Sequence, residues 1–149
     1  MGDVSKGVQA GFAATIVISI LMLIQQAAGL APGFNLIEMI KSAANMDNAV
    51  VAWFVHFIVG VGLWGVGFAA FSPHMWGPHW ARGLIFGAIA WVLMMVIFLP
   101  AAGMPIFAMG LGPSIPVLSL ILHLIYGGVL GESYHLLLHY LPSEVDENA

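Results

Sequence analysis

The chain has 149 residues, of which 61% are hydrophobic and only 7% are charged, and its formal net charge is −4. Soluble domains carry roughly a quarter charged residues, so this composition excludes a soluble domain. Three basic residues offer no electrostatic footprint for nucleic acid, and the absence of cysteine excludes disulfides and thiolate metal sites.

Four continuous apolar stretches use most of the chain, at residues 8–28, 50–71, 83–99 and 116–138. A bilayer core about 30 Å thick needs about 20 apolar residues per helix. In lipid an unbroken apolar run satisfies its backbone only as a helix, whereas barrel strands would alternate in polarity. The sequence therefore predicts an all-α polytopic membrane protein, with four transmembrane helices in one domain over residues 1–142.

Few charges are available to orient these helices. Lys6 precedes the first stretch, Arg82 lies between the second and the third, and Lys41 stands alone on the opposite side. The positive-inside rule then places both termini in the cytoplasm. The first stretch is long for a signal peptide and has only Lys6 at its start, so a retained helix is favoured over a cleaved one.

The connections between the stretches differ in kind. Residues 35–45 are typical of a short amphipathic helix lying in the interface, with Glu38 and Lys41 turned to water. Residues 101–116 are rich in Gly, Pro and Met, which predicts irregular backbone close to the membrane surface or under protein cover. Residues 143–149 form an acidic tail.

An internal repeat relates the two halves of the chain. Its matching positions are Lys6-Gly7 and Gly11 against Arg82-Gly83 and Gly87, and His56 to Gly60 against His123 to Gly127. Each half enters and leaves on the same side of the membrane, so the repeat predicts two pseudo-symmetric hairpins about an axis along the membrane normal. Glycines one turn apart let helices approach closely in lipid.

The repeated histidines are the candidate cofactor-binding residues. His56 and His123 lie at membrane depth, where ionisable side chains are costly and indicate function. Each is followed one turn later by a glycine, Gly60 or Gly127, which leaves a bare surface for a flat macrocycle. The pair is therefore a candidate for the axial ligands of a b-type haem, or for a smaller metal site. Alternatively, each imidazole hydrogen-bonds across helices to a carbonyl or to a side chain such as Gln25.

A second polar cluster lies toward the other membrane face. Glu132, His135 and His139 share one side of the last helix, and His74 and His79 occupy the loop at the same level. Glu-x-x-His on a helix can bind metal in bundles, where it occurs in pairs. This cluster is either a metal site or a set of interfacial polar residues.

The sequence resembles a family of small, uncharacterised four-helix bacterial membrane proteins. The resemblance spans residues 7–131 and rests on the segments 10–15, 53–57, 64–65, 83–87, 90–91, 100–103 and 123–127. It implies a protein of the bacterial inner membrane, and it implies no particular activity.

Several functions are compatible with these features. The sequence contains no nucleophile elbow, phosphate-binding loop or HExxH motif, so no catalytic residue and no activity of its own are predicted. The leading hypothesis is a small non-catalytic subunit of a bacterial respiratory or redox membrane complex. Its partners would be the lipid bilayer and other membrane subunits or further copies of itself. The alternatives are a stand-alone haem-binding electron carrier that uses His56 and His123 and, more weakly, a small-solute channel lined by Gly60 and Gly127.

Overall fold

The structure is a computed structural model that describes residues 2–140, and the predicted acidic tail lies outside the described residues. Its elements are helical throughout the part that is described. In chain order they are α1 (Val4–Ala27), α2 (Leu36–Ala43), α3 (Ala49–Phe57), η1 (Ile58–Gly65), α4 (Val66–Phe71), η2 (Ser72–His74), α5 (His79–Leu93), η3 (Met94–Phe98), α6 (Leu99–Ala101), η4 (Ile106–Ala108) and α7 (Ser114–Tyr140).

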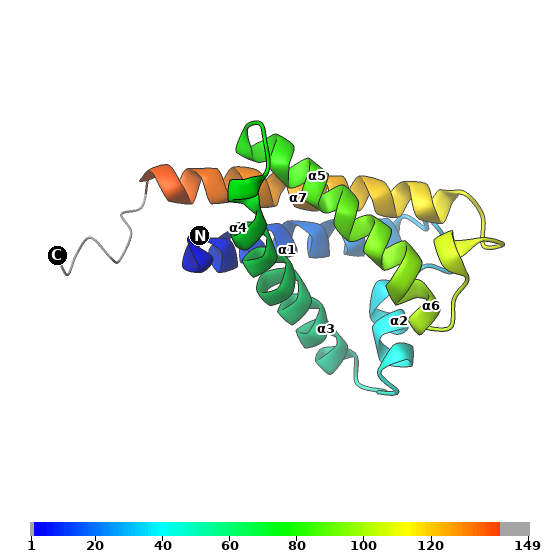
Figure 1. The fold of residues 1–149 in the computed structure, drawn as a ribbon. Coiled ribbons are helices and arrows are strands. Elements are labelled where there is room, and N and C mark those ends of the chain that lie inside the picture. Colours follow the sequence, from blue (N-terminus) through cyan, green and yellow to red (C-terminus); the bar gives the residue numbers. More distant parts are fainter. Residues whose placement is uncertain (1, 141–149) are drawn as a thin grey trace.

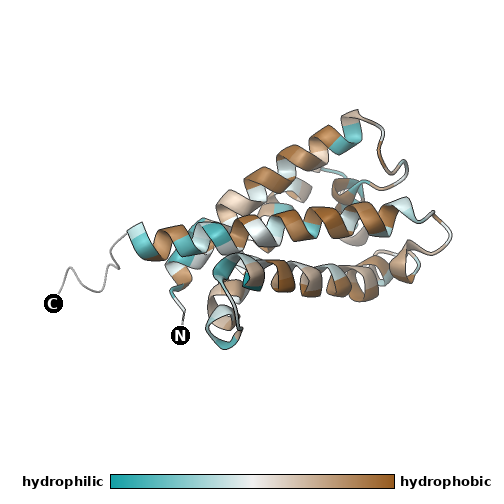
Figure 2. Cartoon of the chain, turned by 90° about the horizontal axis from the view of Figure 1, so that it is seen from above, coloured by the Kyte–Doolittle hydropathy of each residue, from teal (hydrophilic) through white to brown (hydrophobic). Residues whose placement is uncertain are grey.

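Four of these helical runs are long and apolar enough to cross a membrane. The first is α1, the second runs over Ala49–His74, the third over His79–Ala101, and the fourth is α7. Figure 2 shows hydrophobic residues along these spans and hydrophilic residues gathered toward helix ends and loops. The predicted all-α protein of four transmembrane helices is thus confirmed. The third span begins earlier than its apolar stretch because polar His79 and Arg82 extend the helix at its N-terminal end.

Glycines bring the first and second spans into backbone contact. A Cβ atom at Gly7 would lie 2.6 Å from the carbonyl oxygen of Gly65, and one at Gly11 would lie 2.9 Å from the Cα of Gly65. Real Cβ atoms essentially never approach other atoms so closely. These positions therefore accept only glycine, and they hold α1 against η1 and α4.

The third and fourth spans cross in the same way. A Cβ atom at Gly83 would overlap the carbonyl oxygen of Gly127, and one at Gly87 would lie 3.3 Å from the Cα of Gly127. Gly131 completes the crossing, because a Cβ there would overlap the carbonyl oxygen of His79. The repeated glycines of α1 and α5 are therefore contact points in both hairpins, but the glycine that meets α1 is Gly65, which is not part of the repeat.

The two hairpins differ in register by about one helical turn. The Cα packed against Gly87 belongs to Gly127, four residues after His123, whereas the Cα packed against Gly11 belongs to Gly65, nine residues after His56. The sequence repeat instead pairs Gly60 with Gly127. The intervening η1 is a π-helix, a form that often marks functional sites. His56 and His123 therefore lie at different distances from their crossings, although the sequence repeat aligns them.

An aromatic cluster fills the end of the bundle where the helices cross. The Phe68 ring packs edge-on against Phe86 and Tyr134, with ring centroids 5.4 and 5.6 Å apart. Tyr134 is 2% exposed, and its hydroxyl accepts a hydrogen bond from the backbone N–H of Asp3 at 2.9 Å. Because Asp3 is also the N-cap of α1, this contact fixes the start of the first span on the last.

At the opposite end the spans separate. Figure 1 shows α3 and the far end of the third span diverging from the α4–α5 connection, with α2 between them. Asn35 caps α2 by accepting from the N–H groups of Ile37 and Glu38, and Glu38 pairs with Lys41 at 2.9 Å. The amphipathic helix that the sequence predicts is therefore present. The segment after α6 has mostly irregular backbone and is largely exposed, but Ala108 within it belongs to a buried cluster with Ala31 and Phe34.

Substituting Gly83 by alanine should separate the third and fourth spans. The added methyl group would overlap the Gly127 carbonyl, and we expect the free energy of unfolding to fall by about 1–3 kcal/mol. Thermal unfolding of the protein in mild detergent, followed by circular dichroism, measures this.

Gly62→Ala is the matched control, because no atom lies within 4 Å of a Cβ placed there. Because alanine has a higher helix propensity than glycine, this variant should have an unchanged free energy of unfolding or one raised by up to about 1 kcal/mol. Equal loss of stability in the two variants would contradict the role given to the crossing.

Candidate functional site

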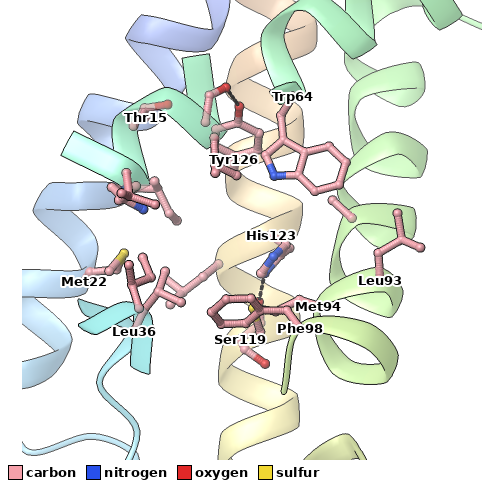
Figure 3. A pocket seen from close by; sticks show the side chains of 18 of the residues that line it. Thr15, Met22, Leu36, Trp64, Leu93, Met94, Phe98, Ser119, His123 and Tyr126 are labelled. Carbon is pink, nitrogen blue, oxygen red and sulfur yellow. Dashed lines mark hydrogen bonds between the residues drawn. The ribbon is translucent and has the colours of Figure 1, made fainter. Parts of the chain in front are cut away.

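A cavity of about 520 Å³ lies in the region where the spans diverge. All four spans and α2 contribute to its wall, and Figure 3 shows part of this lining. Its polar members are Thr15, Gln25, Gln26, His56, Trp64, Ser119, His123 and Tyr126. Apolar side chains make up most of the remaining wall, and none of the described lining residues is Asp, Glu, Lys or Arg. The cavity thus brings both membrane-depth histidines to one site.

Both π-helical segments lie in this wall. Gly60, Leu63 and Trp64 come from η1 in the second span. Met94 and Phe98 come from η3 in the third span. Single π-turns within α-helices are frequent at functional sites, because the wider turn displaces side chains and frees backbone groups. Their presence in the wall supports the cavity as the functional region.

His56 is held by a serine of the first span. Its Nε2 lies 3.1 Å from the Ser19 hydroxyl oxygen, and Ser19 itself donates to the carbonyl of Thr15 at 2.6 Å. Since a hydroxyl has one hydrogen to donate, Ser19 accepts from His56, and Nε2 carries the proton. In the neutral imidazole Nδ1 then keeps the lone pair. The rings of Trp53 and Phe57 pack edge-on against this imidazole.

His123 is held by its own helix. Its Nδ1 lies 2.8 Å from the carbonyl oxygen of Ser119, and Figure 3 shows this bond along α7. A carbonyl can only accept, so Nδ1 carries the proton and Nε2 keeps the lone pair. Because Nδ1 is turned back to the helix, Nε2 is the ring atom directed away from it, and His123 lines the cavity.

Only His56 makes the bond across helices that the hydrogen-bonding alternative predicted, and its partner is a serine. His123 bonds a carbonyl of its own helix instead. Gln25, which the sequence offered as a partner, donates instead to the carbonyl of Leu30 at 3.1 Å.

Tyr126 is a site residue that sequence reasoning missed. Its hydroxyl donates to the carbonyl of Gly60 at 2.6 Å, and the residue is buried. A Cβ atom at Gly60 would overlap the Thr15 hydroxyl, so the first, second and fourth spans meet at this point. A sequence signal existed, because Tyr126 lies one turn after His123 on the same side of the helix.

The residues of the cavity do not fit a bis-histidine b-type haem. The Nε2 of His123 is a suitable axial ligand, but the Nε2 of His56 already donates to Ser19. The described lining also offers no cation to pair with the propionates of the macrocycle. Gly127 is not a bare surface for it either, because it packs against the backbone of Gly83.

The second polar cluster is brought together only in part. The ring centroids of His79 and His135 are 5.0 Å apart, and those of His135 and His139 are 4.1 Å apart. His135 Nδ1 is buried without a hydrogen-bond partner among the described residues. Glu132 and His74 are exposed. Within residues 2–140 no three His, Asp or Glu side chains are placed to hold a metal ion together.

Fold and cavity together define a small multi-pass membrane protein with a chamber between its helices. The chain belongs to the DUF6789 family, a family of unknown function, whose model matches residues 1–144. This agrees with the resemblance to an uncharacterised membrane family. No curated protein and no solved structure matches the chain.

Tyr126→Phe tests the hydrogen bond that joins the fourth span to the second in the cavity wall. Removing the hydroxyl leaves the buried Gly60 carbonyl without this donor, and we expect a loss of about 1–2 kcal/mol in the free energy of unfolding. Tyr140→Phe is the matched control, since Tyr140 is 77% exposed and should change stability by less than about 0.5 kcal/mol. Denaturant titration in detergent measures the free energy of unfolding of both variants. A Tyr126→Phe variant as stable as the wild type would contradict the role given to this hydroxyl.

Proposed function

We propose that this chain is a non-catalytic membrane protein that holds a lipid-soluble molecule in the cavity between its spans. The main support for this proposal is the cavity of about 520 Å³, which is apolar apart from a few hydrogen-bonding side chains. Ligand pockets of this size with few convergent polar groups are typical of small-molecule sites.

The position of the cavity supports entry from the bilayer. The second and third spans contribute lining residues with large exposed fractions, among them Val59 and Leu63 on one span and Leu93 and Ile97 on the other. A molecule dissolved in lipid would therefore reach the site between these two spans. With no charged side chain in the described lining, an ionic solute would lose its hydration without compensation.

Filling the cavity tests this function. Val59→Trp adds an indole at a lining position, whereas Val92→Trp adds one on a comparably exposed helical valine that does not line the cavity. Protein extracted from membranes with a styrene–maleic acid polymer is analysed by mass spectrometry for co-purifying hydrophobic compounds.

We expect a compound in near-stoichiometric amount with the wild type and Val92→Trp, and at least a tenfold reduction with Val59→Trp. Compounds that match the bulk lipid profile in all three samples would contradict the proposal.

The second candidate is the subunit role that the sequence predicts, and it is compatible with the first. The second span supports it, because only 17% of its most apolar 18-residue segment is buried inside the protein, whereas the corresponding share for α1 is 44%. Gly62 lies on this span with open space around its Cα, and glycine lets a helix of a partner approach closely.

Gly62→Leu tests whether a partner packs on this span. We expect the variant to stay folded while larger complexes containing the chain disappear from native gels of mild extracts. Leu63→Ile, at an exposed neighbour, should preserve those complexes. Wild-type protein that migrates alone under the gentlest extraction would contradict this role.

The proposed location is the inner membrane of a bacterium, with both termini in the cytoplasm. An even number of spans places the two ends on one side. Lys6 and Arg82 lie on that side and Lys41 on the other, which supports the orientation by the positive-inside rule.

A further inference from the structure

The hydrogen-bonding groups of the cavity wall do not offer donors and acceptors equally. The hydroxyl of Thr15 donates to the carbonyl of Gly11 at 2.7 Å, and that of Tyr126 donates to Gly60. Ser119 donates to the carbonyl of Pro116 at 3.1 Å. Since each hydroxyl carries one hydrogen, these three side chains have none left for a ligand.

The imidazole of His123 is the opposite case. Its proton lies on Nδ1 because Ser119 presents a carbonyl, so Nε2 is left as an unprotonated acceptor. This nitrogen has no hydrogen-bond partner in the part of the chain that the structure describes. An acceptor in apolar surroundings costs free energy unless a donor reaches it. The fourth span thus presents a fixed acceptor without a partner to a cavity that is lined mostly by apolar side chains.

We propose that the cavity selects apolar molecules that carry a hydroxyl group, which donates its hydrogen to Nε2 of His123. This inference rests on the proposed function and specifies its ligand. An ether or a hydrocarbon of the same shape leaves Nε2 unpaired and binds more weakly. A hydroxyl group can in addition accept from the indole N–H of Trp64, which also lines the cavity.

Two kinds of lipid-soluble molecule carry such a group, namely phenols, including reduced quinones, and aliphatic alcohols. Both donate O–H from an apolar body, and the phenolic hydroxyl is the stronger donor. The neutral wall accepts either without a charged partner. The experiment therefore includes one pair of probes for each source.

The probes are 4-nonylphenol with its methyl ether, 4-nonylanisole, and 1-dodecanol with its methyl ether. Each is titrated into the full chain in lipid nanodiscs, with empty nanodiscs to subtract partition into lipid. We expect each hydroxyl compound to bind saturably and about fivefold to tenfold more tightly than its ether, which corresponds to one hydrogen bond to a buried acceptor. A preference in the phenol pair alone would assign the site to phenols, and one in the alcohol pair alone to alcohols.

Two variants separate the possible failures. His123→Leu should bind both members of a pair with similar affinity, whereas Trp64→Phe should retain the preference for the hydroxyl compound. If hydroxyl and ether bind the wild type equally and Val59→Trp blocks both, the cavity function stands and the donor proposal is overturned. If no probe binds saturably, the proposed function itself fails. The comparison of each hydroxyl compound with its ether in the wild-type protein tests the proposal even if a variant does not fold.

Discussion

The backbone contact between glycine faces is the constraint on which the rest of this structure depends. Gly83 and Gly87 pack against Gly127, and Gly7 and Gly11 pack against Gly65, so in both hairpins the helices touch main chain to main chain. Straight helices that touch at one end and cross at an angle must separate at the other. The aromatic cluster around Phe68 fills the closed end, and the cavity occupies the open end.

The polar groups in the cavity wall are arranged by the same packing. In lipid no water satisfies a buried hydroxyl or imidazole, so each finds a partner within the protein. Ser19 and Ser119 fix the proton positions of the two histidines, and Tyr126 closes onto Gly60. Structural hydrogen bonding thereby determines which atoms remain for a ligand. The chemistry of the chamber is a consequence of how the helices satisfy one another.

The histidine pair shows how a sequence repeat differs from structural symmetry. His56 and His123 occupy matching sequence positions, but the hydrogen bonds of the π-helical η1 span one residue more than those of an α-helix, and this segment meets α1 at Gly65. The two imidazoles therefore share a cavity without being equivalent. One proton lies on Nε2 and the other on Nδ1, and this difference is incompatible with a symmetric pair of axial ligands. It leaves His123 as the side chain best placed to meet a bound molecule.

The sequence by itself determined the class of the protein, its four spans, the short amphipathic helix and the glycines that α1 and α5 contribute to the crossings. Hydrophobicity and helical spacing are local properties, and in lipid they admit few alternatives. Only the tertiary structure decided the register of each crossing, the partners of His56 and His123, and the junction of Thr15, Gly60 and Tyr126. These features depend on which turns of separate helices meet, and a shift of one turn changes them without altering the hydrophobic pattern.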